Sequence, residues 1–492
     1  IDTERYVTMG ENKFSRAATG DFLKVAEIMD AVGMNYGERN YEAVRRAHPD
    51  WLIYGSETSS ATRTRDSYYN PAQILGHDNR PNRHYEQSDY GNDRVGWGRT
   101  ATESWTFDRD RAGYAGQFIW TGIDYIGEPT PWHNQDNTPV KSSYFGIIDT
   151  AGLPKNDFYL YRSEWYSAKE KPTVRILPHW NWTEETLKNR KMLVDGMVPV
   201  RTFSNAASVE LFLNGESLGK KEFTKKRTED GRPYHEGAKP SELYLEWLVK
   251  YQPGTLTAIA RDENGNEIAR DSVTTAGEPA RVRLTKEEHV ITADGKDLSY
   301  IHYEIVDGEG NVVPTANNLV HFNLHGQGQI VGVDNGEQAS RERYKAQADG
   351  TWQRRAFNGK GVVIVKSTEK EGKFTLYADS AGLTSDSATV ATVSGKKENR
   401  HFVAFAPVKA TTDVTTNPEL PQTVTAIYSD GSVEEKTVTW DVPADLLTSA
   451  GEKKVYGRVE GLESKAEALV KVIALDRWLP KVATVPVGTT AA

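Results

Sequence analysis

The stretch WLIYGSE at residues 51–57 decides the fold of the first part of the chain. Its first four residues form a continuous apolar run, which is typical of a strand that is buried on both faces of a parallel sheet. AVGMNY at 31–36 and QFIW at 117–120 are two further runs of this kind, extending to about 116–121 for the last. We therefore predict three buried strands, at about 31–36, 51–56 and 116–121.

Helical signals separate these strands. Residues 21–30 carry apolar side chains at positions 22, 25, 26 and 29, the spacing of an amphipathic helix. A second helix is expected over 39–47, because the His48-Pro49 pair that follows it disfavours helical backbone. Two more are expected at about 97–112 and 156–166. Alternating helices and strands predict a parallel sheet.

The number of strands points to an incomplete barrel. An eight-stranded (β/α) barrel needs about 250 residues, and only three strands are predicted in this region. Residues 1–168 are therefore predicted to be the C-terminal part of a TIM-barrel catalytic domain whose earlier strands are missing from this chain. We expect such a fragment to be unstable or inactive by itself, since it would leave sheet edges and core exposed.

The rest of the chain has short alternating strands and frequent turn signals, among them Asn214-Gly215 and Asp307-Gly308. This pattern is typical of all-β sandwich domains. A similar closing hairpin recurs near residues 276, 395 and 475. It predicts an Ig-like β-sandwich at 169–276, an Ig-like or invasin-like sandwich at 277–395 and a bacterial Ig-like domain at 396–475. A linker or tail is predicted at 476–492.

Composition excludes several classes of function. The chain has 492 residues and a formal net charge of -9, which does not favour binding to a phosphate backbone, so no nucleic-acid partner is expected. No apolar run approaches the ~18–20 residues of a membrane span. The absence of cysteine excludes disulfides and thiolate metal sites. The first residues, Ile1 to Glu4, do not resemble a signal peptide.

Chemistry is expected where the strands end, because the active site of a parallel barrel lies at the C-terminal ends of its strands. There the strands lead to Tyr36, Glu57, Trp120 and Asp124. Carboxylates beside a large aromatic ring suit a sugar, whose C–H face stacks on the ring while a carboxylate attacks the anomeric carbon. From position alone, Glu57 is the best candidate for a nucleophile.

Each of these residues also has a structural interpretation that the sequence leaves open. A glutamate at a strand end is more often a surface residue, and a tryptophan in a buried strand is more often part of the core. In the structural interpretation, Asp124 and Glu128 hold the loop that follows the last strand.

Three motifs in order resemble glycoside hydrolase family 2. VGMNYG at 32–37 with HPDW and YGSET at 48–58 resembles the nucleophile region of that family. GQFIWTGIDY at 116–125 and SYFGIID at 143–149 resemble its last barrel strand and the following loop. ITADGKDL at 291–298 and the Ig-like segments are similar to the family's bacterial surface members.

The resemblance implies roles for individual residues. Glu57 would be the nucleophile, Tyr36 would hydrogen-bond its carboxylate and Trp120 would be the platform under a galactose. Asp124 would lie at the same substrate-binding mouth. The implied activity is that of a retaining β-galactosidase acting on terminal β-linked galactose, with β-1,4 linkages as in lactose or N-acetyllactosamine expected. A secreted or cell-surface location follows from the resemblance alone.

One departure from the family is important. The family's acid/base glutamate follows an asparagine in an upstream strand, whereas Glu11-Asn12 has the reverse order and no apolar strand before it. The acid/base is therefore expected outside this chain, on the missing N-terminal segment, which would be a partner of these residues. No cofactor and no metal site are expected from this sequence.

Two alternatives remain open at this stage. One is a surface carbohydrate-binding or adhesion protein that acts through its Ig-like domains. The other is a related β-glucuronidase or β-mannosidase, because the nucleophile loop does not determine which sugar is bound.

Overall fold

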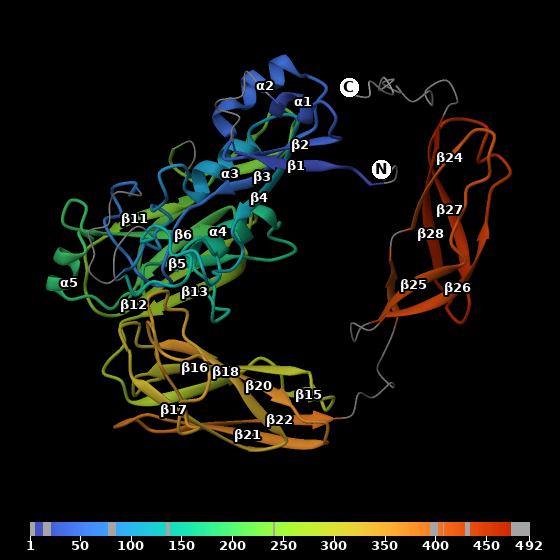
Figure 1. Ribbon diagram of the computed structural model, residues 1–492. Coiled ribbons are helices and arrows are strands. Elements are labelled where there is room, and N and C mark those ends of the chain that lie inside the picture. The colour runs from blue at the N-terminus through green and yellow to red at the C-terminus, as the bar shows by residue number, and fades with distance from the viewer. Residues whose placement is uncertain are drawn as a thin grey trace, which may run out of the picture. The chain divides into compact units, whose positions relative to one another are not determined.

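The computed structural model describes residues 5–12, 21–76, 85–133, 138–239, 242–393, 402–406, 408–428 and 433–473. The predicted tail at 476–492 lies outside these residues. The chain divides into two compact units, Val7–Ser394 and a second unit of Ile1–Tyr6 with Gly395–Ala492. Both are dominated by β-strands, as Figure 1 shows.

The first unit begins with a four-stranded parallel sheet in the order β1-β2-β3-β4. Its strands are β1 (Thr8–Glu11), β2 (Ala31–Asn35), β3 (Ile53–Ser59) and β4 (Tyr114–Trp120). The helices around it are α1 (Asp21–Ala26), a 3-10 turn (Glu38–Asn40), α2 (Tyr41–Ala47) and α3 (Ala101–Arg109). A small core of Val32, Met34, Ile53, Tyr41 and Tyr114 joins the helices to the sheet. The three predicted strands are thus present.

Strand β1 corrects the sequence analysis, which placed no strand before Glu11-Asn12. Residues Thr8 to Glu11 pair in parallel with β2, with Gly10 opposite Gly33. The segment is short and mixes polar with apolar residues, so periodicity did not reveal it. Its strand conformation is fixed by backbone hydrogen bonding to β2, a long-range interaction.

The sheet does not close into a barrel within the described residues. Both β1 and β4 are edge strands with one neighbour each. On β4, Phe118 is 68% exposed, although parallel strands are normally buried on both faces. The described part of the chain therefore holds a half-barrel sheet, and a complete TIM barrel remains a prediction.

Helix α4 (Asn156–Trp165) leads into the first sandwich. One sheet has the order β11-β6-β5 and the other β13-β12-β7-β8, with a separate hairpin of β9 and β10. The bounds are β5 (Val174–Leu177), α5 (Glu184–Asn189), β6 (Val198–Ser204), β7 (Ser208–Leu213), β8 (Glu216–Glu222), β9 (Thr224–Arg227), β10 (Pro233–Glu236), β11 (Leu245–Val249), β12 (Thr255–Arg261) and β13 (Glu267–Thr274).

One continuous core connects this sandwich to the parallel-sheet region. Val200 and Leu211 from its two sheets belong to the same buried cluster as Leu160 and Tyr161 of α4 and Tyr90 of the long loop after β3. Tyr90 also donates a hydrogen bond from its hydroxyl to the Pro199 carbonyl over 2.6 Å. The first sandwich and the parallel-sheet region therefore share one hydrophobic core.

The second sandwich packs a four-stranded sheet, β14-β16-β20-β18, on a five-stranded sheet, β15-β22-β21-β17-β19. The bounds are β14 (Arg281–Lys286), β15 (Val290–Thr292), β16 (Leu298–Val306), β17 (Leu319–Gly326), β18 (Gly328–Asp334), β19 (Trp352–Arg355), β20 (Lys360–Ser367), β21 (Gly372–Asp379) and β22 (Asp386–Val393).

The second unit contains a six-stranded arrangement in the order β23-β25-β26-β27-β28-β24. The bounds are β23 (Phe402–Phe405), β24 (Val408–Asp413), β25 (Thr423–Tyr428), β26 (Val433–Asp441), β27 (Gly451–Val459) and β28 (Lys465–Ile473). Val455 and Val470 lie in one of its small cores.

Candidate active site

The C-terminal edge of the parallel sheet brings three predicted site residues together. Glu57 on β3 lies opposite Asn35, the last residue of β2, and Ser59 lies opposite Trp120, the last residue of β4. Tyr36 follows β2 directly, and its backbone N–H donates to the Glu57 carbonyl over 2.9 Å. Glu57, Tyr36 and Trp120 therefore lie at the same end of three adjacent strands.

Tyr36 is tied to Glu57 by its side chain as well. Its pKa is raised chiefly by burial, and further by the negative charge of Glu57 and a hydrogen bond with that carboxylate. Ser60 donates a hydrogen bond to the Tyr36 hydroxyl over 2.7 Å. The raised pKa keeps the phenol protonated, so that it remains a hydrogen-bond donor to Glu57.

The backbone is unusual at this edge. Tyr36, Ser59 and Ser60 have φ angles of 51°, 70° and 54°, in the left-handed region that residues other than glycine seldom occupy. Such conformations cluster at functional sites, where the surrounding structure holds them. They turn the chain out of the strands just where the three side chains meet.

Gly55 explains how β3 approaches its neighbour. A Cβ there would lie 2.7 Å from the Tyr114 hydroxyl and closer still to the Thr58 side chain. Ser56 is held from the other side, since its hydroxyl donates to the Asn35 side-chain oxygen over 2.5 Å. These contacts fix the strand immediately before Glu57.

Trp120 begins a second part of the cluster. Its ring is edge-on to Tyr125 with centroids 5.7 Å apart, and the Tyr125 hydroxyl donates to the Glu128 carboxylate. Burial raises the pKa of Tyr125, and so does this bond to Glu128. The charge of Glu128 also contributes to the raised pKa of Tyr36. Glu128 is thus a second carboxylate of the cluster, which the sequence analysis treated only as a loop residue.

Asp124 has a different setting. Its carboxylate is buried and accepts hydrogen bonds from Lys155 Nζ over 2.6 Å, from the Gly146 N–H over 2.8 Å and from Gln338 Nε2 over 3.0 Å. Burial raises its pKa to about 6, although the charge of Lys155 opposes this. This geometry favours the loop-holding interpretation. A contact between Asp124 and a substrate stays a prediction.

Gln338 belongs to the second sandwich, yet it reaches the loop that follows Trp120. The Gln338 side chain also donates to the Arg63 carbonyl over 3.2 Å. The backbone carbonyl of Gln338 accepts a hydrogen bond from the Lys141 N–H over 3.2 Å. No local pattern marks this residue, because its partners are distant along the chain: 214 positions for Asp124 and 275 for Arg63.

A buried ion pair in the loops of the parallel-sheet region also contacts the second sandwich. Arg65 Nε lies 2.6 Å from Asp149 Oδ2, and the two side chains are 2% and 0% exposed. Arg65 also donates to the carbonyls of Asn335 and Phe357 over 2.9 and 3.0 Å. Gly336, at a φ of 76°, packs so closely on Asp149 that a Cβ would overlap its carboxylate. The second sandwich is therefore anchored directly to the loops below the cluster.

A further carboxylate lies near this edge. Glu11 is the last residue of β1 and lies opposite Met34, one position before Asn35 of β2. Its position at the strand end was missed because β1 itself was not predicted. No group of three potential metal-ligating side chains occurs among the described residues. In the same residues, no helix has the length and apolarity to cross a bilayer.

Comparisons with known proteins match three segments. Residues 282–389 match the model of glycoside hydrolase family 2 C-terminal domain 5, and residues 405–462 match a bacterial Ig-like domain of group 4. Residues 195–269 match a domain of unknown function, DUF4982. The expectation of an Ig-like domain is confirmed.

Curated relatives extend the likeness to most of the chain. The β-galactosidase BoGH2A of Bacteroides ovatus is 38% identical over 389 residues, which cover 78% of this chain and 41% of that protein. The chain is similar to glycoside hydrolases of family 2. A putative β-glucuronidase of Formosa agariphila is 29% identical and is matched over 74% of this chain and 32% of its own length. The chain thus spans less than half of the curated relatives it matches.

Solved structures agree in fold. A β-glycosidase from Bacteroides vulgatus superposes with a TM-score of 0.60 at 28% identity, over 74% of this chain and 45% of that one. A family 2 glycosyl hydrolase from Bacteroides cellulosilyticus gives a TM-score of 0.56 at 26% identity, over 80% and 45% of the two chains. Both superpositions show that this chain shares its fold with part of those proteins.

Proposed function

We propose that this chain carries the nucleophile part of a retaining β-galactosidase, with Glu57 as the nucleophile. The observation that supports the proposal most is the junction of Glu57 with Tyr36 at the C-terminal ends of adjacent parallel strands, beside Trp120. In this arrangement a carboxylate oxygen of Glu57 attacks the anomeric carbon while the bond to the leaving sugar oxygen breaks. Water then cleaves the glycosyl–Glu57 ester, so the configuration is retained.

Tyr36 and Trp120 take supporting roles in this mechanism. The Tyr36 hydroxyl orients the attacking carboxylate and stabilises the charge on it before attack. Trp120 offers a flat apolar face under the galactose ring. The proton for the leaving oxygen comes from a second carboxyl group, which we assign to a segment outside this chain. General acid help of this kind is worth ~10²–10⁴-fold.

The proposal therefore concerns a protein in which the half-barrel is completed. The edge strands β1 and β4 and the exposed Phe118 support the need for additional strands. The expected activities apply to this chain joined to the segment that supplies the remaining strands and the acid/base carboxyl group. Full-rate lactose hydrolysis by the chain alone would contradict the assignment of the acid/base to that segment.

A β-glucuronidase is the second candidate, because a relative named putative β-glucuronidase also matches, at 29% identity against 38% for the β-galactosidase. A uronate needs a cationic partner for its carboxylate, whereas galactose needs hydroxyl-binding groups. Comparing kcat/KM for 4-nitrophenyl β-galactoside, β-glucuronide and β-mannoside distinguishes a β-galactosidase from a β-glucuronidase and a β-mannosidase. Preference for the glucuronide would replace the sugar assignment and leave Glu57 in place.

Covalent trapping tests the proposal most directly. A 2-deoxy-2-fluoro-β-galactosyl fluoride destabilises the oxocarbenium-like transition state but carries a good leaving group, so a glycosyl-enzyme accumulates. Peptide mass spectrometry is expected to find the label on Glu57. A label on Glu128, or no label on a folded protein, would overturn the nucleophile assignment. A label on Glu128 would move the nucleophile to that residue, whereas the absence of any label would favour a surface adhesion role.

Replacing Tyr36 with Phe is expected to lower kcat about 10–100-fold, because a hydrogen bond to a charged group contributes roughly 1.5–3 kcal/mol. Steady-state kinetics with the galactoside measure the effect. Tyr54→Phe is the matched control, since that hydroxyl bonds Thr8 over 3.1 Å on the same sheet. Equal effects of the two substitutions would contradict the role given to Tyr36.

Replacing Gln338 with Leu is expected to move the acid limb of the kcat/KM profile to higher pH. The Gln338 N–H stabilises the ionised Asp124, so its loss raises the pKa of Asp124 above about 6. Protonation then breaks the contact with Lys155 at a higher pH, and activity falls earlier as the pH is lowered. Exchange of the amide hydrogens in 121–128 is expected to speed up.

The control for this change is Gln329→Leu, which alters an exposed glutamine of the same sandwich. An unchanged acid limb together with unchanged amide exchange would show that Gln338 does not support the loop.

We further propose a secreted, cell-surface location, as for the large streptococcal surface β-galactosidases that the sequence resembles. The Ig-like strands of the second unit support this proposal by analogy alone. Labelling of intact cells with an antibody against residues 402–473 tests it.

A further inference from the structure

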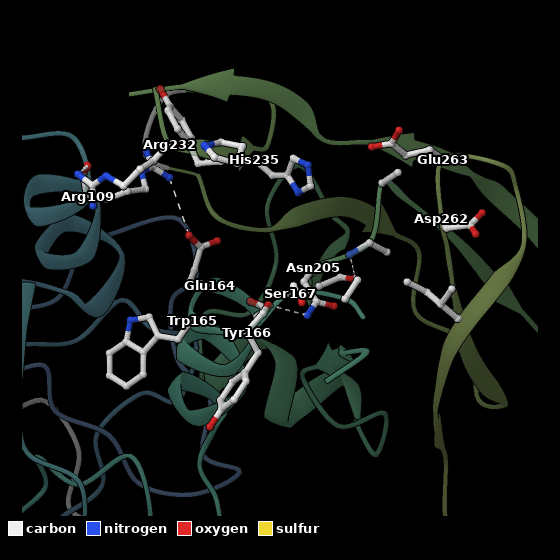
Figure 2. A pocket seen from close by; sticks show the side chains of 18 of the residues that line it. Arg109, Glu164, Trp165, Tyr166, Ser167, Asn205, Arg232, His235, Asp262 and Glu263 are labelled. Atoms are coloured by element: carbon white, nitrogen blue, oxygen red, sulfur yellow. Dashed lines mark hydrogen bonds and ion pairs between the residues drawn. The ribbon is translucent and has the colours of Figure 1, made fainter. Parts of the chain in front are cut away.

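A cavity of about 480 Å³ lies away from the strand ends that carry Glu57 and Trp120. Its walls come from the C-terminal ends of α3 and α4, the β9–β10 hairpin and loops of the first sandwich (Figure 2). Helix α3 ends at Arg109, and only four residues separate it from Tyr114, where β4 begins. The cavity is therefore near the start of β4, whereas Trp120 is at its other end.

Aromatic rings form one side of this cavity. Trp165 and Tyr166 both line it and are 46% and 47% exposed, which is unusual for neighbouring large aromatic side chains. Trp105 packs edge-on to Trp165 with ring centroids 6.1 Å apart and so holds it in place. Tyr234 of β10 lies under the Arg109 guanidinium at 3.7 Å. Flat apolar surfaces of this kind stack well on the C–H face of a pyranose.

Buried polar groups lie beside these rings. Arg109 is 5% exposed, and its Nη1 has no hydrogen-bond partner among the described residues. It lies 3.9 Å from a carboxylate oxygen of Glu164. Buried donors are normally paired, so an open donor at a cavity wall indicates a place for a ligand oxygen. Glu164 accepts a hydrogen bond from Trp105 Nε1 over 2.7 Å, and burial raises its pKa to about 7. It can therefore accept or donate a further hydrogen bond near neutral pH.

The balance of charge favours a neutral ligand. The charge of Arg109 is already offset by Asp110 at 2.7 Å and Glu236 at 3.5 Å. Asp262 and Glu263 line the opposite side of the cavity, as Figure 2 shows. His235 stays neutral, because burial lowers its pKa. Arg232, which also lines the cavity, is paired with Asp230 at 2.9 Å, and Glu263 is paired with Lys225. An anion such as a phosphate or a uronate would therefore have to compete with these carboxylates for each cation.

We propose that this cavity binds a neutral pyranose unit of a glycan, as a non-catalytic site separate from Glu57. Trp165 and Tyr166 would stack on the sugar ring, and Arg109 and Glu164 would bond its hydroxyl groups. The volume is within the range of small-ligand sites and accommodates one or two sugar units.

Photoaffinity labelling tests the proposal without relying on hydrolysis. A methyl β-galactoside that carries a diazirine is irradiated with the Glu57→Gln protein, and labelled peptides are mapped by mass spectrometry. We expect labels in 163–168 and 232–236, separate from any label near Tyr36 or Trp120. Trp165→Ala and Tyr166→Ala are each expected to reduce the cavity labels about tenfold.

Trp97→Ala is the matched control, because Trp97 is 47% exposed and lies outside this cavity. Equal labelling of the Trp165, Tyr166 and Trp97 variants, or no label in the cavity peptides, would overturn the proposal. Stronger labelling by a diazirine β-glucuronide would overturn the preference for a neutral sugar. Cavity labels in a protein that hydrolyses no glycoside would contradict the proposed enzyme activity and leave this site standing.

Discussion

Replacing Glu57 with Gln is expected to lower the turnover of a β-galactoside by at least roughly 10³-fold, since the amide cannot form the glycosyl-enzyme. The substitution keeps the size of the side chain, and the backbone bond from the Tyr36 N–H to the Glu57 carbonyl does not depend on it. KM is expected to change much less than kcat, because ground-state binding uses other groups. Stopped assays with 4-nitrophenyl β-galactoside measure both.

A smaller side chain provides a second, chemically distinct result. Glu57→Ala opens space next to the anomeric carbon, and added azide is expected to enter it and attack there. The product would be the α-galactosyl azide, with the configuration inverted once. Chromatography with an authentic standard detects it.

Glu42→Gln is the control for both experiments, because Glu42 is 60% exposed on α2. Retention of more than a tenth of the activity by Glu57→Gln, or azide rescue of Glu128→Ala in its place, would move the nucleophile to another residue.

Replacing Arg65 with Met is expected to lower the free energy of unfolding by about 3–5 kcal/mol, because it leaves the buried Asp149 without its cationic partner. It also removes the donors to the Asn335 and Phe357 carbonyls, which anchor the second sandwich. Urea denaturation followed by tryptophan fluorescence is expected to show a lower midpoint and a separate early transition for residues 277–393.

Two further variants sharpen this test. Arg355→Met removes a 54% exposed guanidinium that lies 3.7 Å from Glu342, and its effect is expected to stay below about 1 kcal/mol. Arg65→Met combined with Asp149→Leu removes both charges, so part of the lost stability is expected to return. If Arg65→Met alone lowered the free energy of unfolding no more than Arg355→Met does, the contacts of Arg65 would not hold the second sandwich.

The parts of the fold that were predicted from sequence are those with a local signal. The apolar runs at 31–36, 51–54 and 117–120 mark the places of β2, β3 and β4, although β3 begins only at Ile53 and Leu52 and Phe118 are 59% and 68% exposed. Strand β1 was missed because a mixed four-residue segment carries no periodicity. Its conformation depends on β2, which lies about 20 residues further along the chain.

The candidate site likewise contains residues that the sequence could place and residues that only long-range contacts place. Glu57, Tyr36 and Trp120 could be placed at one edge from strand order alone, since parallel strands end together. The surroundings of Asp124 could not, because Lys155 and Gln338 approach it from α4's N-terminal side and from a separate sandwich. Glu128 joins the cluster only through the fold of the loop after β4.

The core that α4 shares with the first sandwich also limits how this chain can be rearranged over evolution. A recombination break near residue 168 would separate Leu160 and Tyr161 from the side chains they pack against, and a break near 276 would separate Arg65 from its partners in the second sandwich. We therefore expect the compact unit Val7–Ser394 to be inherited as one block, with the Ig-like unit free to be gained, lost or exchanged beside it.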